Sequence, residues 1–522
     1  MVSRKMEVQL GIHLPNYQFK PSTSNTQLLP MNPLKKLASE AGLYGLPSIL
    51  GRVLTYLLVP LHTTVFIPEQ FGSIGELYAY AAFLNIIYTY GMETAYFRFS
   101  TKEKSESYYA QAFTSILLTS ILFSGGIFLF AEQIIQFLGL SVQTYIVRYL
   151  AAIFFIDAIV AIPLAKLRLA HKARKFAFTR ISNIVLNILL NLCFLMLFPY
   201  LAKIGIMDWE EQKPLDIGYV FLANLLANLS MIFILYKEIF LVRLQFNWAK
   251  MKKMLVYSWP ILLMGVAGIS VDQLDKVIFE HLLPENFYEG KTAEAALGIY
   301  LAAFKLSVFM MLAIQAFRYA GEPFFFSQAE DKEAPELFAK VLYYFVSLSL
   351  VIWVGVSLNA DLIGKIFLRS AEYREALFLV PILLFGKLFF GIYINLSIWF
   401  KITDKTYYGV YISVLGGLVA LIGNILLIPV LGYTGAALAS VMAYFSMMIY
   451  CYFTGQKYFR IPYPIGKIAL NILIAGIIIV AFFYFKPANL WLNYGLGIGI
   501  TILYTGVMFL YERKRIFSKR LK

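Results

Sequence analysis

The sequence predicts an all-α polytopic membrane protein with about fourteen transmembrane helices, arranged as two related six-helix bundles followed by two C-terminal helices. Composition is the first observation behind this prediction. Of the 522 residues, 60% are hydrophobic and 14% are charged, whereas roughly half and a quarter are usual in soluble domains. The second observation is that apolar blocks recur from Leu43 almost to the C-terminus, each of about 20 residues and therefore long enough to cross a bilayer as a helix.

The apolar blocks follow one another with short connections. Their approximate bounds are 41–63, 74–97, 109–131, 146–168, 178–200, 217–240, 254–279, 297–320, 338–358, 375–398, 407–428, 433–454, 466–485 and 490–511. The blocks lack the alternating pattern of barrel strands. Because the bilayer core offers no water to backbone polar groups, each block is expected to be a helix.

A weak internal duplication relates the two halves of the chain. Tyr44-Gly-Leu-Pro47 opens the first block, and Tyr257-Ser-Trp-Pro260 opens the seventh. Without gaps, the segment 175–199 lies over 405–429. An even number of helices in each copy gives both copies the same orientation, so the expected cleft lies between the two bundles.

The duplication sets the expected domain boundaries. The first bundle is expected at 31–245 and the second at 246–455, and residues 456–522 hold two extra helices and a basic tail. Residues 1–30 are polar with scattered prolines, which predicts a disordered tail.

The basic residues alternate between connections, which predicts the orientation. If the N-terminus is cytoplasmic, inner segments hold 32 Lys and Arg and outer segments hold 8. This bias places both termini in the cytoplasm under the positive-inside rule. The net charge of +15 is therefore explained by membrane topology, and nucleic acid is not an expected partner.

A few ionisable residues fall deep inside the spans. Arg52, Asp157, Lys305 and Lys387 lie about 12–18 Å from the nearer helix entry, at 1.5 Å per residue. A charge at this depth costs about 2.5–3.5 kcal/mol if it faces lipid. All four side chains are therefore expected to face protein or a wet cavity.

The sign of these charges suggests a ligand class. Arg52, Lys305 and Lys387 would form a cationic lining, and Asp157, which the repeat aligns with Lys387, would tune it or titrate. The resulting charge of about +2 complements a diphosphate, for which Arg and Lys are suited. The alternative is that these charges form local ion pairs or hydrogen bonds that hold helices together.

Charged residues near the span ends are gating or ion-coupling candidates. Arg318, Glu322, Glu93 and Arg98 lie near the expected cytoplasmic ends of the eighth and second spans, where cross-bundle ion pairs or ordinary interfacial contacts are both possible.

A second set of charges lies late in the seventh span. Asp272, Asp275 and Lys276 share one helical face near its expected outer boundary. They mark either a plain membrane interface or the outer mouth of the cleft.

We expect no metal site, no cofactor and no enzymatic activity. Cys193 and Cys451 lie inside apolar blocks without a partner at metal-ligand spacing, and the four histidines are scattered. The chain contains no GxxxxGK[ST] phosphate loop, which argues against a nucleotide-driven pump.

Three stretches carry a resemblance to a known family. They are LKKLASEAGLYGLPSILGRVLTYLLVPLHT, FGSIGELYAYAAFLNIIYTYGMETAYFRF and the Asp275-Lys276-x-x-Phe pair. With the six-six-two helix arrangement, the chain resembles the polysaccharide-type (O-antigen-type) oligosaccharide flippases of the multidrug/oligosaccharidyl-lipid/polysaccharide exporter superfamily. The resemblance extends over nearly the whole chain from Met31.

The resemblance implies an alternating-access carrier in a bacterial inner membrane. Such a carrier moves a polyprenyl-diphosphate-linked oligosaccharide to the outer leaflet for lipopolysaccharide or other surface polysaccharide, alongside polymerase and glycosyltransferase partners. Related flippases use cavity arginines on the first and eighth helices, for which Arg52 and Arg318 are the matches here.

Two other functions compete with this reading. A multidrug or cation antiporter of the same superfamily would share the fold, but it would more naturally carry acidic residues deep in the bundles, where this chain is mainly basic. A polytopic oligosaccharide polymerase would usually need a sizeable extramembrane loop, and the longest connections here are only about 15–20 residues.

Overall fold

The computed structural model describes residues 50–520 except 52, 55, 104, 106, 210–214 and 330; it does not describe the side chains of 320, 322, 323, 327 and 512–520. The expected tail at 1–30 and the first nine residues of the first expected span lie outside the described residues. Within the described part of the chain, all regular structure is helical, as the sequence predicts for backbone in lipid.

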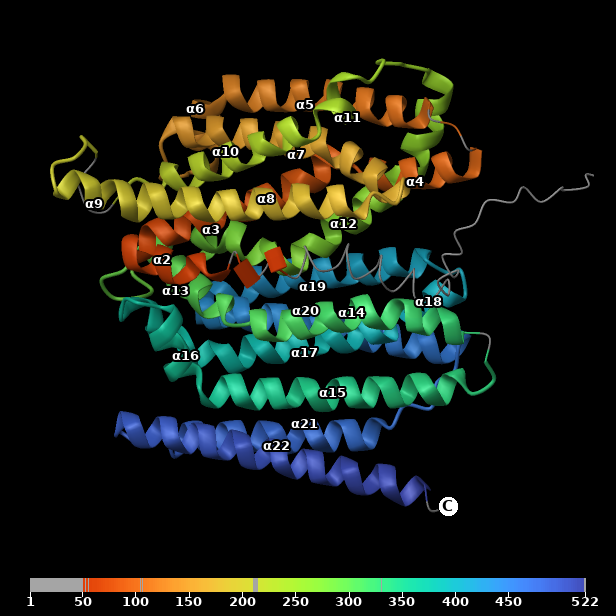
Figure 1. The fold of residues 1–522 in the computed structure, drawn as a ribbon. Coiled ribbons are helices and arrows are strands. Elements are labelled where there is room, and N and C mark those ends of the chain that lie inside the picture. Colours follow the sequence, from red (N-terminus) through yellow and green to blue (C-terminus); the bar gives the residue numbers. More distant parts are fainter. Residues whose placement is uncertain are drawn as a thin grey trace, which may run out of the picture. The chain divides into compact units, whose positions relative to one another are not determined.

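The helices of the first half run back and forth across the view in Figure 1. They are α2 (Leu58–Val65), α3 (Pro68–Thr89), α4 (Met92–Glu103), α5 (Ser107–Leu129), α6 (Ala131–Leu138), α7 (Thr144–Leu169), α8 (Ala173–Leu192), η2 (Cys193–Leu197), α9 (Phe198–Lys203), α10 (Gly218–Ile234) and α11 (Tyr236–Phe240).

The second half continues the same pattern. Its helices are α12 (Trp248–Leu282), α13 (Ala293–Lys305), α14 (Val308–Gln328), α15 (Ala334–Leu358), α16 (Ala360–Phe367), η3 (Glu372–Leu379), α17 (Val380–Leu396), α18 (Ile398–Ile402), α19 (Tyr407–Leu431), α20 (Tyr433–Tyr458), α21 (Ile465–Tyr484) and α22 (Leu490–Arg520).

Local sequence signals explain several helix ends. Asn247 caps α12 by accepting the Lys250 backbone N–H at 3.1 Å, and Thr292 caps α13 by accepting that of Ala295 at 3.1 Å. The expected second span, 74–97, is split because Tyr90 and Gly91 adopt positive φ angles of 32° and 71° between α3 and α4. Glycine favours such a turn, since it has no Cβ to clash.

Ten helices of the described chain are long and apolar enough to cross a membrane, or eleven if the pair α13 and α14 is one span bent by 46°. The expected count of fourteen is therefore not confirmed. The second expected span corresponds to α3, whose tyrosines, Glu76 and Asn85 lower its hydropathy, and the sixth to α10, which has only 17 residues.

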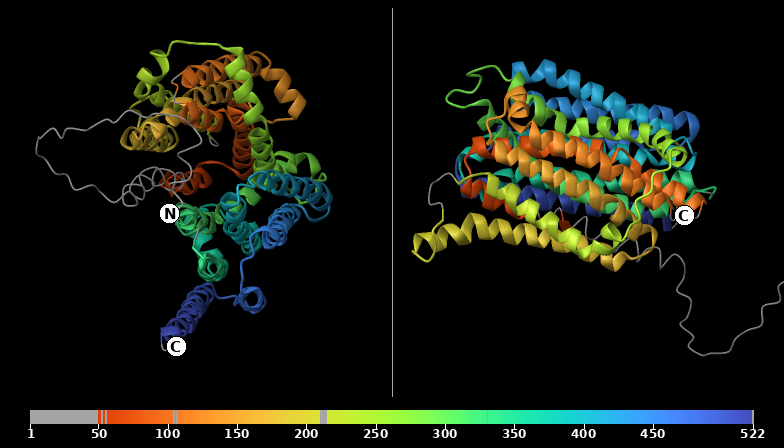
Figure 2. Two further views of the ribbon diagram at one scale, coloured as in Figure 1. Left: turned by 90° about the vertical axis from the view of Figure 1, so that its right-hand side faces the viewer. Right: turned by 90° about the horizontal axis from the view of Figure 1, so that it is seen from above.

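The helices form two groups around separate apolar cores. The first core draws on α2 to α8, η2, α10 and α11 and on Met251 and Met254 of α12, and we call this group, together with α9, the N-lobe. The second draws on α13 to α22 and on Val271 and Phe279 of α12, and it also takes in Val59 of α2 and Phe71 of α3. We call the group formed by α13 to α20 and the end of α12 the C-lobe. The 35-residue α12 thus belongs to both lobes (Figure 2).

The two ends of the helices differ in charge. The end with connections 166–180, 237–253 and 401–405 carries α4, α11 and α18, on the right in Figure 1, and we call it the basic end. The other, called the opposite end, carries α6, α9 and α16. Helices α21 and α22 both contact α15 of the C-lobe.

A glycine-lined seam joins the lobes at the opposite end, where α3 of the N-lobe packs on α13 of the C-lobe. A Cβ on Gly72 would overlap the backbone carbonyl of Glu294, and a Cβ on Gly298 would overlap that of Pro68. The two backbones can meet only because both positions lack a side chain. We call this contact the α3–α13 seam.

We expect Gly298→Ala to destabilise the protein, because the added methyl group would force α3 away from α13. Overpacking typically costs about 1–3 kcal/mol, so the thermal unfolding midpoint of the purified protein in detergent should fall. Gly126→Ala on α5 is the matched control, because no atom lies within 4 Å of its would-be Cβ. Equal midpoints for the two variants would contradict the close seam.

Candidate functional site

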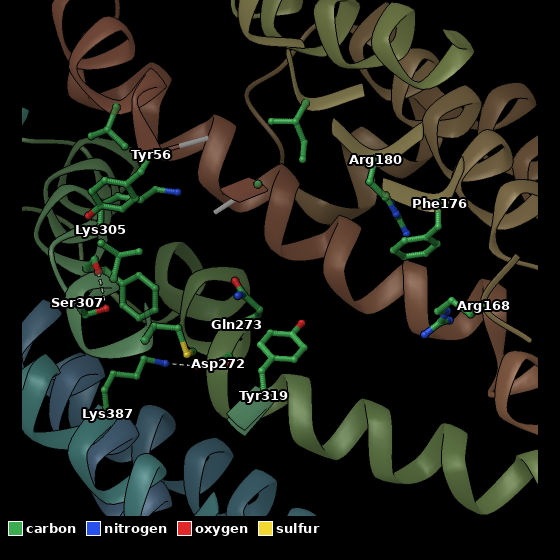
Figure 3. Close-up of a pocket in the computed structure, with 16 residues that line it drawn as sticks. Tyr56, Arg168, Phe176, Arg180, Asp272, Gln273, Lys305, Ser307, Tyr319 and Lys387 are labelled. Carbon is green, nitrogen blue, oxygen red and sulfur yellow. Dashed lines mark hydrogen bonds and ion pairs between the residues drawn. The ribbon is translucent and has the colours of Figure 1, made fainter. Parts of the chain in front are cut away.

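A cavity of about 730 Å³ lies between the lobes. Its walls come from the residues before α2 and from α2, α7, α8, α12, α13, α14 and α17, so both lobes contribute. The ionisable and polar side chains of the wall are Tyr56, Arg168, Arg180, Asp272, Gln273, Lys305, Ser307, Tyr319 and Lys387. Figure 3 shows Lys305, Lys387 and Asp272 on one side of the cavity and Arg180 and Arg168 on the other.

Lys305 is placed by the break between α13 and α14. It is the last residue of α13, and the following residues, Leu306 and Ser307, lead into a 46° bend. A cation at this position is favourable beside the carbonyl groups of the helix C-terminus. Its side chain is exposed to the cavity, and no carboxylate of the described residues lies within ion-pair distance. Lys305 therefore has charge to offer a ligand.

Arg180 faces the cavity from the N-lobe. Phe176, Arg180 and Ile184 follow one another at intervals of four along α8, and all three line the cavity. The guanidinium is exposed, has no carboxylate of the described chain within ion-pair distance, and interacts electrostatically with Asp157. Sequence reasoning missed this residue by counting it with the basic connection 166–180, although the spacing of four was a usable signal.

Lys387 differs from Lys305 because its charge is balanced. Its Nζ donates to Asp272 Oδ1 and lies 2.9 Å from the hydroxyl of Tyr444, which also donates to Asp272 Oδ1. The Lys387 side chain is only 5% exposed, whereas that of Asp272 is 27% exposed. The pair fixes α12 against α17 and α20 at the cavity wall.

A second pair lies directly behind the first. Lys276 Nζ donates to Asp275 Oδ1 at 3.0 Å and to the carbonyl oxygen of Asp272, while Tyr300 donates to Asp275 Oδ2 at 2.6 Å. The ring of Phe304 lies 4.0 Å from Lys276 Nζ. Two lysines and two aspartates thus form an electrically neutral set, which we call the C-lobe charge network.

Asp275 and Lys276 of the C-lobe charge network are enclosed by protein. Asp275 and Lys276, expected near the outer boundary of the seventh span, are 2% and 3% exposed. They are buried because α12 packs against α13, α19 and α20 of the C-lobe.

Asp157 lies in the N-lobe, away from the cavity wall. It accepts a hydrogen bond from Asn228 at 2.9 Å, and Asn228 accepts one from Asn183 at 2.8 Å. This chain links α7, α10 and α8. Asp157 and Lys387, which the repeat aligns, therefore have separate partners in separate lobes.

The other predicted residues are not among the described residues that line this cavity. Arg52 lies outside the described residues, and so does the side chain of Glu322. Arg318 is exposed on α14 and is not among the described residues that line the cavity.

Two gating candidates on α4 have partners near the basic end. Glu93 pairs with Arg168 within the N-lobe, while Arg98 lies 4.3 Å from the ring centroid of Tyr257 on α12. The ion pair therefore joins α4 to α7, and the cation–π contact joins α4 to α12.

The wall chemistry suits an anionic ligand. Four basic side chains and one carboxylate line the cavity, and the two cations without an ion-pair partner in the described chain, Lys305 and Arg180, come from opposite lobes. Arg can bind a phosphate through a two-pronged hydrogen bond, and Lys adds a point charge. Among the described residues, no group of three or more His, Cys, Asp and Glu could hold a metal ion.

The fold is similar to that of solved transporters. The lipid II flippase MurJ in an inward closed conformation gives a TM-score of 0.71 at 15% identity, over 91% of this chain and 99% of that one. An inward-facing multidrug resistance MATE family transporter of the MOP superfamily gives 0.59 at 13% identity, over 80% and 95%. A MOP superfamily transporter from Pyrococcus furiosus, described as having a binding pocket of reversed polarity, gives 0.53 at 14% identity, over 80% and 95%.

No curated protein matches the sequence of this chain at a significant level. A family model described as polysaccharide biosynthesis protein matches residues 65–377, from the end of α2 into η3. Because the matched segment is more than half of the chain, this protein belongs to the polysaccharide biosynthesis protein family.

Proposed function

We propose that this protein is a carrier that moves a polyprenyl-diphosphate-linked oligosaccharide from the cytoplasmic to the outer leaflet of a bacterial inner membrane, for surface polysaccharide biosynthesis. The observation that carries this proposal is the cavity between the lobes, which Lys305 and Arg180 line from opposite lobes without ion-pair partners in the described chain. Family membership and the fold shared with a lipid II flippase support it.

The proposed orientation places the basic end in the cytoplasm, together with both termini. The cavity lining extends from Lys305 to Arg168 and Tyr319, which lie toward the basic end, while the α3–α13 seam closes the opposite end. The lobes would therefore be arranged to receive a ligand from the cytoplasmic side. Opening the seam and closing the basic end would present the ligand to the other side.

The proposed ligand contacts follow from charge balance. The diphosphate would lie between Arg180 of the N-lobe and Lys305 of the C-lobe, with the sugar in the cavity and the prenyl chain in lipid. Because the two cations belong to different lobes, one anion would draw both lobes together. Lys387 would contribute less, since Asp272 already neutralises it. Polymerase and glycosyltransferase partners remain part of the proposal, because they would supply and use such a ligand.

A multidrug or cation antiporter is the second candidate, since MATE transporters share the fold. A cationic ligand would meet four basic side chains and one carboxylate on the cavity wall. This charge balance repels cations and favours the first proposal.

We expect Lys305→Ala and Arg180→Ala each to weaken binding of polyprenyl diphosphate to the purified protein by about tenfold to a hundredfold, because a hydrogen bond to a charged group contributes about 1.5–3 kcal/mol. Cells that carry either variant should accumulate lipid-linked oligosaccharide on the cytoplasmic leaflet.

The matched control is Lys203→Ala, which removes an exposed cation on α9 at the opposite end. Normal export and unchanged affinity in both cavity variants would refute the cationic site.

A separate prediction concerns the ion pair between Lys387 and Asp272. Lys387→Met alone should destabilise the protein by up to about 3 kcal/mol, because it leaves the Asp272 carboxylate unpaired in the cavity wall. Adding Asp272→Asn should restore much of the thermal unfolding midpoint. A double variant no more stable than the single one would show that the pair is not the source of the loss.

A further inference from the structure

Three carboxyl groups lie on the helices around the α3–α13 seam. Glu76 lies one turn after Gly72 on α3 of the N-lobe, while Glu280 near the end of α12 and Glu294 in the first turn of α13 belong to the C-lobe side. Glu280 and Glu294 are both close enough to Glu76 to interact with it electrostatically. The seam therefore brings like charges together across the two lobes.

Two of these groups are buried without hydrogen-bond partners. Glu76 is 3% exposed, and its Oε1 has no partner; the Oε1 of Glu280 is also buried without one. Glu294 is half-buried and accepts a hydrogen bond from the exposed Ser141 hydroxyl at 3.1 Å. Glu294 is thus the member nearest to water, and Glu76 is the most enclosed.

The basic groups around the seam have other partners. On α12, Lys276 donates to Asp275, and on the α12–α13 connection, Lys291 pairs with Glu375 at 2.8 Å. Arg148 of α7 lies 3.9 Å from Glu132, and His281 faces the turn at Gly139. Among the described residues, no Lys, Arg or His forms an ion pair with the three carboxyl groups.

The surroundings are also apolar. A cavity of about 450 Å³ next to the seam is lined almost wholly by hydrophobic side chains, among them Leu77 beside Glu76 and Val277 one turn before Glu280. The hydroxyl-bearing Tyr80 lines the same cavity and interacts electrostatically with both carboxyl groups. Repulsion between two carboxylates is strong in such a medium, and an unpaired buried charge costs several kcal/mol.

We propose that Glu76 and Glu280 form a proton-binding site that locks the α3–α13 seam. In the closed seam at least one of the two carboxyl groups carries a proton, so that the pair has at most one negative charge. A metal ion is a poorer fit, because the described residues offer no group of three or more acidic, His or Cys ligands.

The site couples protons to the movement of the lobes. When the seam opens, water reaches both carboxyl groups, each ionises and a proton is released; when it closes, a proton is taken up. The closed seam is therefore favoured at low pH and lost as the pH rises, and one proton changes the ratio of closed to open protein by at most about tenfold per pH unit. This inference rests on the proposed carrier function, for which it supplies the control of the opposite gate.

The test measures the distance between spin labels across the seam in lipid nanodiscs. Labels on Gln143→Cys of the N-lobe and Glu289→Cys of the C-lobe connection, both exposed, are introduced after Cys193→Ala and Cys451→Ala. In the protein that keeps both Glu76 and Glu280, the distance between the labels should shift from short toward long as the pH is raised from 5 to 9.

The double variant Glu76→Gln and Glu280→Gln, which imitates the protonated pair, should keep the short distance throughout and should slow glycan export. Glu132→Gln changes a carboxyl group at the same end but outside the seam. In this variant the distance between the labels should change with pH as it does in the protein that keeps Glu76, Glu280 and Glu132.

The proposal is overturned if the distance distribution with the carboxyl pair intact does not change with pH, if the double variant keeps the full response, or if sodium at constant pH produces the same shift. The measurement uses no glycan substrate. A normal pH response in a protein that exports no glycan would therefore refute the carrier function and leave the proton site standing. Normal glycan export without a pH response would refute the proton site and leave the carrier function standing.

Discussion

The arrangement of this protein depends on the cost of burying an unpaired charge among apolar helices. That cost sorts the interior charges into two groups. Lys276, Lys387, Asp272 and Asp275 neutralise one another within the C-lobe charge network, where tyrosine hydroxyls supply further hydrogen bonds. Lys305 and Arg180 have no carboxylate partner in the described chain, and both are exposed to the cavity, where water can reach them. The neutral C-lobe charge network and the two cations without carboxylate partners therefore lie side by side in the wall of one cavity, as the proposed anionic ligand requires.

The two lobes meet through elements with different physical characters. At the opposite end, glycines allow α3 and α13 to touch backbone to backbone, and a contact of that kind has no side chains that could adapt to a partial shift. Toward the basic end, the cavity separates the lobes, and α12 carries the chain from the N-lobe core into the C-lobe core. Alternating access requires a tight contact between the lobes at one end and an open cavity at the other. In each cycle of the proposed carrier, the closed end would open and the open end would close.

Much of the candidate site could be predicted from the sequence, because depth in a span is a matter of counting. Lys305 and Lys387 were expected to face inward, and both line one cavity. Counting could not find their partners: Asp272 and Lys387 are 115 positions apart, and Asp272 and Tyr444 are 172 apart. The same limit explains why the aligned pair Asp157 and Lys387 gave no indication that each bonds within its own lobe. Arg180 was missed because it was counted with the basic connection 166–180, where a basic residue looks like any other topology signal.

The sequence by itself determined that the chain is helical and membrane-embedded, and that its charge is concentrated at one end, because hydropathy and charge act locally along the chain. It also determined which ionisable residues are too deep to face lipid. Only the tertiary structure decided which of those charges are neutralised and which remain available, since pairing depends on helices that are distant in sequence and meet only after packing. The glycine seam and the unpartnered carboxyl groups beside it were decided in the same way, by the approach of α3 to α13.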